Sequence, residues 1–215
     1  TPGPPTPGTP SKVQETAFHE AGHAVMRLFV GLRVFSASVL PAPDDSLGRV
    51  CVDTLDEDIK TAKRPLRLAT AEVWCALAGC AAQALRLTQT ETCPPDLDRA
   101  LILLRWKLEG QPDLDRARQI ARSVNRSRPA AQRWLRRLEW EVVLGLIHSP
   151  GLWGSIEAVA MALVEYRELD GAVVEWIVRE VAQGRPYLDL RGELVARVVE
   201  STAAQVAVTK KAMCP

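Results

Sequence analysis

The 215-residue sequence lacks a strong charge of either sign, has only five cysteines and contains no phosphate-binding loop, and each shortage excludes a class of protein. Lys+Arg 27 against Asp+Glu 26 gives a net charge of +1, whereas proteins that bind phosphate backbones are usually more basic. No glycine is followed by lysine, which excludes the P-loop motif. The sequence therefore predicts neither a nucleic-acid partner nor ATP binding.

The number of cysteines and the length of the apolar runs indicate where in the cell the protein is expected. The cysteine count is odd and no CxxC pair is present, which argues against a disulfide framework or a structural zinc knuckle. The longest apolar runs, at 73–85 and 142–156, are interrupted and shorter than the roughly 18 residues that a membrane span needs. No signal segment opens the chain. We expect a soluble, cytoplasmic protein without a membrane span.

The pattern of the chain predicts a mostly α fold with a small β-sheet, of the α+β class. Residues 1–10 (TPGPPTPGTP) look like a disordered linker, residues 11–208 form the domain, and residues 209–215 are a tail. Ser11 and Gln14 form a capping box for a helix that ends near Val30. Two strands are expected at 33–40 and 48–54. Helices are expected near 65–88, 95–109, 113–123, 130–148, 152–167, 170–182 and 189–208.

Residues 19–23, HEAGH, are an H-E-x-x-H motif inside the first predicted helix. Residues i and i+4 share a helix face, so His19 and His23 can bind one ion. Glu20 is rotated by about 100° from His19, where the base for an activated water belongs. The spacing predicts a Zn²⁺ site; the alternatives are a chance occurrence of the motif and a degenerate site without metal.

The motif leaves one protein ligand to find. His148 closes an apolar run and is interpreted as a helix-end or core histidine. A carboxylate is therefore expected, from Glu72, Asp96 or Asp98. Acids such as the two aspartates also complement the dipole of a helix that they begin, which is the structural alternative.

Five segments together resemble the protease domain of the FtsH-type AAA+ metalloproteases. They are residues 18–25 (FHEAGHAV), 38–41 with 47–50 (SVLP and LGRV), 76–83 (ALAGCAAQ), 92–100 (TCPPDLDRA) and 162–171 (ALVEYRELDG). The resemblance covers about residues 11–180 and implies a helical FtsH-type peptidase domain with a zinc helix. Its register implies that the third ligand is Asp96.

The chain also departs from this family. The ATPase module and the membrane helices are missing, Gln83 stands where the family has Glu, and Cys80 stands where Arg or Gly is usual. Residues 110–133 do not follow the family closely. The resemblance implies peptidase chemistry, and the absent unfoldase implies flexible or unfolded substrates.

The favoured interpretation is an ATP-independent zinc metalloendopeptidase that hydrolyses flexible proteins or peptides. Zn²⁺ on His19, His23 and Asp96 lowers the pKa of a water, and Glu20 accepts its proton. The hydrogen-bond donor to the oxyanion is left open among three candidates: Tyr166, Tyr187 and His148. An edge of the small sheet is expected to pair with extended substrate. The alternative is a pseudoprotease that acts as an oligomerising or binding module; in either case a homo-oligomer is possible.

Overall fold

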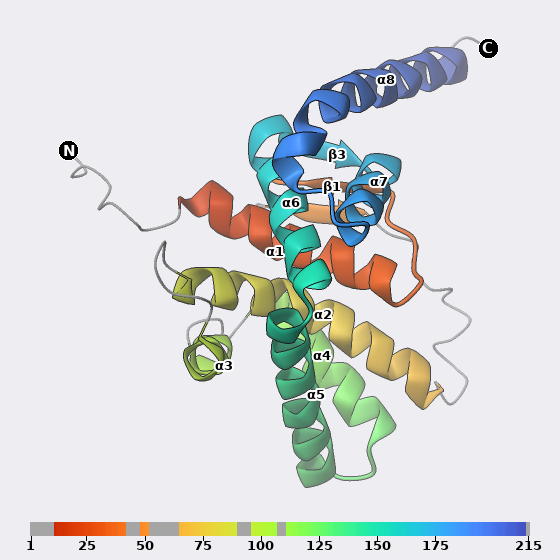
Figure 1. Ribbon diagram of the computed structural model, residues 1–215. Helices are drawn as coiled ribbons and strands as arrows, with labels where there is room; N and C mark the ends of the chain where they lie inside the picture. Colours follow the sequence, from red (N-terminus) through yellow and green to blue (C-terminus); the bar gives the residue numbers. More distant parts are fainter. Residues whose placement is uncertain (1–10, 42–47, 52–64, 90–95, 107–110, 214–215) are drawn as a thin grey trace, which may run out of the picture.

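The computed structural model describes residues 11–41, 48–51, 65–89, 96–106 and 111–213. Within these ranges the chain forms helices and three short strands (Figure 1). In chain order they are α1 (Lys12–Phe29), β1 (Ser36–Ser38), β2 (Arg49–Cys51), α2 (Leu66–Thr88), α3 (Leu97–Trp106), α4 (Pro112–Val124), α5 (Arg128–His148), α6 (Pro150–Tyr166), β3 (Glu168–Asp170), α7 (Gly171–Ala182) and α8 (Tyr187–Met213). The predicted mostly helical fold with a small sheet is confirmed.

Helix α1 begins with the predicted capping box. The Ser11 hydroxyl accepts a hydrogen bond from the Gln14 backbone N–H at 3.3 Å, and the Gln14 side chain accepts one from the Ser11 N–H at 2.9 Å. Two N–H groups that would otherwise lack a partner at the helix start are thereby satisfied. The helix ends at Phe29, and Gly31 takes the left-handed conformation, φ +80°, that suits glycine after a helix.

The sheet has the order β2-β1-β3, with both pairs antiparallel. Strands β1 and β2 lie inside the two predicted ranges. The third strand is a difference from the prediction, which left residues 168 and 169 between the helices at 152–167 and 170–182 and expected no strand there. Only three residues form β3, too few for a readable alternation, and its partner β1 is far away in the sequence: Ser36 pairs with Asp170.

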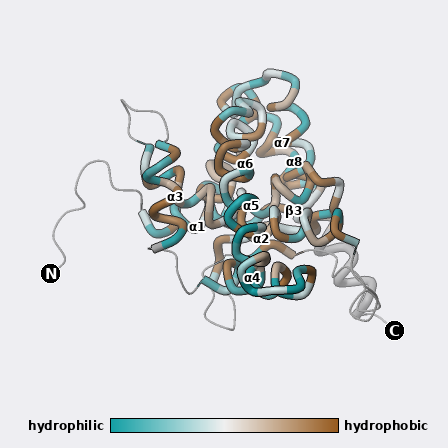
Figure 2. Tube along the Cα trace, turned by 90° about the horizontal axis from the view of Figure 1, so that it is seen from below, coloured by the Kyte–Doolittle hydropathy of each residue, from teal (hydrophilic) through white to brown (hydrophobic). Residues whose placement is uncertain are grey.

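Helix α2 is the centre of the core. It packs against α1, α3, α4 and α5, while α1 also packs on α6. The contact with α1 is close because small residues meet there: a Cβ on Gly22 would lie 2.5 Å from the carbonyl oxygen of Ala78. Figure 2 shows hydrophobic residues along the segments of the helices that pack together. The histidine helix is thereby held rigidly against α2.

The length and composition of α2 would also suit a membrane span, although 72% of its apolar window is buried within the protein. Helices α5 and α6 meet the same criterion only as a pair, and the pair is bent by 85°. Burial of α2 accounts for its apolar sequence, because a core helix needs the same composition.

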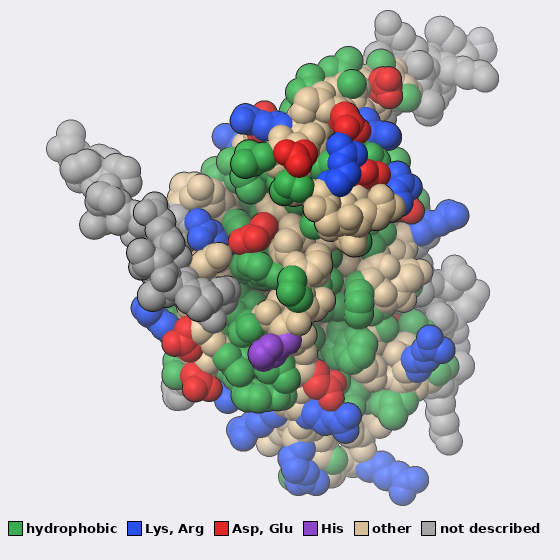
Figure 3. Space-filling model, viewed as in Figure 1, with side chains coloured by type: hydrophobic (Ala, Val, Ile, Leu, Met, Phe, Trp, Pro, Cys, Tyr) green, Lys and Arg blue, Asp and Glu red, His purple; other side chains and the backbone are tan. Residues whose placement is uncertain are grey.

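The two ends of the molecule differ: a long helix projects from one end, and basic side chains gather at the other. Helix α8 projects from one end and continues to Met213, beyond the end at 208 that the sequence predicted. At the other end, where α4 leads into α5, Figure 3 shows a group of Lys and Arg side chains. Arg122, Arg126, Arg128 and Arg133 are exposed there. The predicted linker at 1–10 lies outside the described residues.

Most tryptophans whose side chains the structure describes lie in the core or pack against it. Trp176 is buried, and Trp153 packs against Phe18 with ring centroids 5.9 Å apart. Among the tryptophans whose side chains the structure describes, Trp140 alone is exposed, at 44%. Helix α1 thus contacts α6 through the aromatic pair of Phe18 and Trp153.

Candidate metal centre

Helix α1 places the two histidines of the motif on one face, as the i, i+4 spacing predicted. The Nε2 atoms of His19 and His23 lie 3.0 Å apart, and the rings meet edge to face. Their side chains are only 13% and 14% exposed. The local geometry of one helix therefore brings two potential ligand atoms together.

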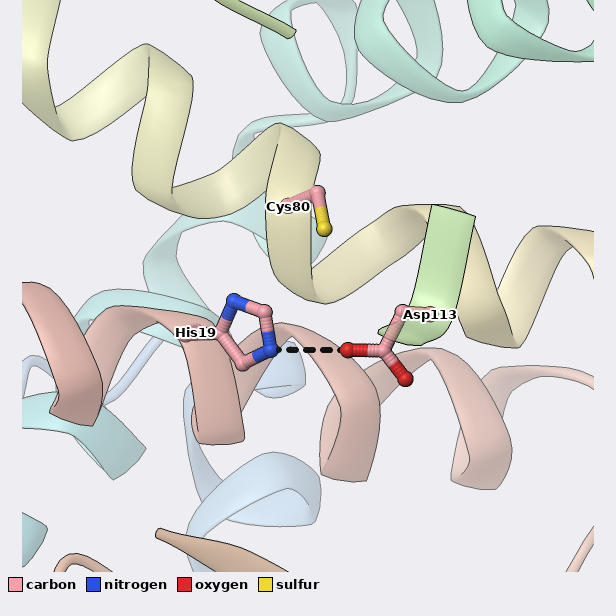
Figure 4. A group of neighbouring side chains, drawn as sticks. All are labelled: His19, Cys80 and Asp113. Atoms are coloured by element: carbon pink, nitrogen blue, oxygen red, sulfur yellow. Dashed lines mark hydrogen bonds and ion pairs between the residues drawn. The ribbon is translucent and has the colours of Figure 1, made fainter. Parts of the chain in front are cut away.

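The carboxylate at this pair is Asp113, in the first turn of α4. Its Oδ2 lies 3.1 Å from the Nε2 of His19 and 3.1 Å from the Nε2 of His23. Figure 4 shows the Asp113 side chain directed at His19 from the neighbouring helix. The three atoms form a nearly equilateral triangle.

Hydrogen bonds on the far side of each ring determine which nitrogen faces the triangle. The Nδ1 of His23 lies 2.7 Å from the Cys75 carbonyl oxygen, which accepts only, so this nitrogen carries the proton. The Nδ1 of His19 lies 3.3 Å from Oε1 of Gln83, whose amide donates to Glu15 at 3.3 Å. In this arrangement Nδ1 donates in both rings, and both Nε2 lone pairs face Asp113.

These contacts show what Gln83 does at the site. Its amide oxygen accepts a hydrogen bond from His19, and its amide nitrogen is oriented by Glu15. An amide oxygen can hold an imidazole in one tautomer as a carboxylate does, although without the negative charge. The departure at residue 83 therefore leaves the orientation of His19 intact.

The three converging atoms fit a zinc ion. Three acceptors without a donor between them repel one another, and a cation removes that repulsion. In a tetrahedral site with bonds of about 2.0–2.1 Å to nitrogen and oxygen, neighbouring ligand atoms lie about 3.3 Å apart. The observed 3.0–3.1 Å is close to that value. The donor set of two imidazoles and one carboxylate suits zinc, although these atoms alone do not name the metal.

The structure gives Asp96, the ligand expected from the family register, a different position. Asp96 is exposed and begins α3: its Oδ1 accepts from the Arg99 backbone N–H at 2.9 Å, and its own N–H donates to Thr88 at 3.1 Å. It acts as a helix cap. In this structure Asp113, and not Asp96, lies against the two histidines, which favours Asp113 as the carboxylate; the Asp96 assignment stays a prediction.

The other residues considered from the sequence also lie elsewhere. Asp98 is an exposed first-turn acid of α3, and Glu72 is buried on α2 outside the group of metal-capable side chains found among the described residues. His148 is the exposed last residue of α5, as its interpretation as a helix-end histidine predicted. Tyr187 donates its hydroxyl to Glu165 at 3.3 Å. These contacts supply no donor at the histidine pair.

Sequence reasoning missed Asp113 because it lies in the stretch 110–133 that does not follow the family. The residues QPD at 111–113 read as an ordinary helix start, with proline at N1 and acids that complement the dipole. No local feature distinguishes Asp113 from Asp115, the other acid in that turn. Only the packing of α4 on α2 turns Asp113 toward the histidines.

Glu20 lies beside the histidines, under the start of β2. It is only 7% exposed, and a Cβ on Gly48 would lie 2.6 Å from its Oε1. Burial raises the pKa of Glu20, the positive charge that His23 and His19 can carry lowers it, and Asp113 raises it; the net shift is upward. A buried carboxylate of raised pKa is typical of groups that exchange protons.

Without a metal, a proton on Nε2 turns an imidazole of the pair into a donor, and the imidazolium and aspartate charges then stabilise each other. Burial raises the pKa of Asp113, but hydrogen bonds from His19 and His23 lower it further, well below the usual range. Burial lowers the pKa of His23, but Asp113, Glu20 and the Cys75 carbonyl raise it to above its ordinary value. Asp113 is therefore a carboxylate at neutral pH, the form that binds a cation.

Helix α2 completes the surroundings with Gly79 and Cys80. A Cβ on Gly79 would collide with the His23 ring at Nε2, Cδ2 and Cε1, so the ring lies directly on the glycine. Cys80 is fully buried, and its sulfur, a His19 nitrogen and an Asp113 oxygen all lie within 4.8 Å of one another (Figure 4). Burial, together with the Asp113 and Glu20 charges, raises the pKa of the Cys80 thiol.

No known protein-family model matches the chain, and a search of curated proteins finds none that is significantly similar to it. The resemblance to FtsH-type proteases therefore rests on the motif segments alone.

Proposed function

We propose that this chain is a zinc metallopeptidase that cleaves flexible or unfolded protein without ATP. The observation that carries the proposal is the triangle of His19 Nε2, His23 Nε2 and Asp113 Oδ2, three acceptors within 3.1 Å of one another. The resemblance of residues 18–25 to the zinc helix of FtsH-type proteases supports the same chemistry.

Each residue of the site has a separate role in the proposed reaction. His19, His23 and Asp113 would hold the metal, which when bound polarises a peptide carbonyl and activates water for attack. Glu20 accepts the proton of the attacking water at its carboxylate and returns it to the leaving amine. Its burial limits its contact with bulk water, and Gly48, which has no Cβ, leaves room for the carboxylate.

The sheet offers a way to align the substrate. Strand β1 is central and paired on both sides, and Gly48, directly before β2, lies against Glu20. An extended peptide that pairs with β2 would pass beside the base near Gly48. A folded substrate would first have to open locally at a free-energy cost, which favours disordered substrates.

ATP has no evident role, because the chain contains no P-loop motif. Activity is therefore expected to be indifferent to added nucleotide and faster on casein than on a stably folded protein. Equal cleavage of both substrates, or stimulation by ATP, would contradict this part of the proposal.

The decisive experiment measures zinc content and casein cleavage of the full chain. Wild-type protein should bind one zinc per chain, and Glu20→Gln should keep the zinc but lose about 10²-fold or more of the rate. Asp113→Asn should lose zinc, whereas Asp96→Asn, which preserves a good helix cap, is the matched control and should keep it. Zinc loss in Asp96→Asn but not in Asp113→Asn would return the ligand to Asp96.

Two other outcomes would overturn the proposal. A wild-type protein that binds no zinc after reconstitution has no metal centre of this kind. Full zinc occupancy without cleavage of any unstructured substrate would instead favour a binding module that keeps the site but not the activity.

A further inference from the structure

Cys80 is positioned to act on the metal centre, although the proposed peptidase chemistry has no use for it. Its side chain is fully buried on α2, next to the glycine on which His23 lies. Figure 4 shows the thiol on the side of α2 that faces His19 and Asp113. The residue is therefore part of the site by geometry, rather than a distant buried cysteine.

The distances allow coordination after a small adjustment. The sulfur, a His19 nitrogen and an Asp113 oxygen lie within 4.8 Å of one another. Around a tetrahedral zinc, with bonds of about 2.3 Å to sulfur and 2.0–2.1 Å to nitrogen or oxygen, such atoms lie about 3.5 Å apart. For His19 and Asp113 the gap is at most about 1 Å, which rotation about the Cα–Cβ bond of Cys80 can cover. His23 lies outside this group of three, so coordination by both histidines also needs the sulfur to move toward the His23 ring.

We propose that Cys80 is a fourth protein ligand, which closes the centre as a two-histidine, aspartate and cysteine site. The inference rests on the proposed metal centre and concerns its regulation. A catalytic zinc site keeps one position open for water, whereas a site with four protein ligands is closed. The closed form is a latent state in equilibrium with the open form, so the wild-type chain keeps a reduced cleavage activity, and release of the sulfur restores the open form.

The bonding change is simple. One sulfur–metal bond would form as one S–H bond breaks; the water at the fourth position and the proton would leave to solvent, with no change in oxidation state. A thiolate is a soft ligand, so its participation favours zinc over magnesium or calcium.

Cys75 provides a matched control on the same helix. It is also buried, at 5% exposure, but it lies outside the group formed by His19, Cys80 and Asp113. Its link to the site is the backbone carbonyl that accepts from His23, which a serine at this position retains. A merely structural role for buried thiols would affect both cysteines alike.

The test uses the full chain loaded with Co²⁺ in place of zinc and followed by optical absorption. Wild-type protein should show visible d–d bands and, in the near ultraviolet, a thiolate-to-cobalt charge-transfer band. Cys80→Ser should lose the charge-transfer band while it still binds one cobalt, and Cys75→Ser should keep it. After zinc loading, Cys80→Ser should cleave casein several-fold faster than wild type, because the fourth position is free.

The outcomes separate this inference from the proposed function. Cobalt d–d bands without a charge-transfer band, or a band that persists in Cys80→Ser, would overturn the fourth ligand while leaving the metal centre in place. A band that Cys80→Ser removes with no gain in cleavage would overturn the latent state. Failure of the wild-type chain to bind cobalt at all would overturn the metal centre and this inference with it.

Discussion

Substitution of Gly79 by alanine tests whether the contact between α2 and His23 positions the metal ligand. The added Cβ would overlap the His23 ring, which would have to withdraw by about 1 Å to reach ordinary van der Waals contact. Metal–ligand distances tolerate only about 0.2 Å, so the displaced ring no longer reaches the ion that His19 binds. Loss of an orienting contact alone costs about 10–100-fold in metal affinity, and we expect at least that loss.

The effect on stability separates this mechanism from simple misfolding. Alanine in a helix interior is about 1 kcal/mol more favourable than glycine, and overpacking costs about 1–3 kcal/mol, so metal-free Gly79→Ala should be close to wild type or modestly less stable. Gly145 on α5 is the matched control, because a Cβ there meets nothing within 4 Å. Gly145→Ala should raise the melting temperature by about 2–4 °C without changing zinc affinity.

The assay is a zinc titration against a chromogenic chelator, with circular dichroism to show that each metal-free variant is folded. Wild-type zinc affinity in a folded Gly79→Ala protein would refute the reasoning, because the His23 ring would then have room that the packing denies it. Equal loss of affinity in Gly145→Ala would show that the effect is not specific to the contact.

Three further predictions follow from single contacts. Gln83→Leu removes the acceptor of the His19 N–H and should lower zinc affinity about 10–100-fold, whereas Gln83→Glu keeps an acceptor and should retain zinc binding. Equal zinc affinities of Gln83→Leu and wild type in a chelator titration would contradict the role of Gln83. Ser11→Ala breaks the capping box of α1 and should cost about 1 kcal/mol in urea unfolding, and an unchanged midpoint would show that the cap contributes nothing. Burial raises the pKa of Cys75 to about 11, so at pH 8 it stays a thiol and iodoacetamide should modify it only after unfolding; mass spectrometry that finds it alkylated in folded protein would disprove its burial.

Much of the secondary structure could be predicted because its causes are local. The start of α1 follows from Ser11 and Gln14, and its end from Gly31. Most of the other helix boundaries were predicted to within a few residues, because proline and glycine separate the helices at places such as 149–151 and 184–186. The strand β3 was missed because three residues carry no period, and its pairing with β1 depends on contacts across the whole domain.

Part of the candidate site could likewise be predicted from local sequence, and part depends on tertiary packing. The sequence alone determined that His19 and His23 share one face with Glu20 beside them, because 3.6 residues per turn is a property of the helix itself. It did not determine the carboxylate, since Asp113 is 94 residues from His19 and looks like any acid at a helix start. The packing of α4 against α2 brings Asp113 to the histidines. The contact of α1 with α2 places Gln83, Gly79 and Cys80 around them. Both contacts join residues far apart in the sequence, so they depend on tertiary structure and no local sequence pattern encodes them.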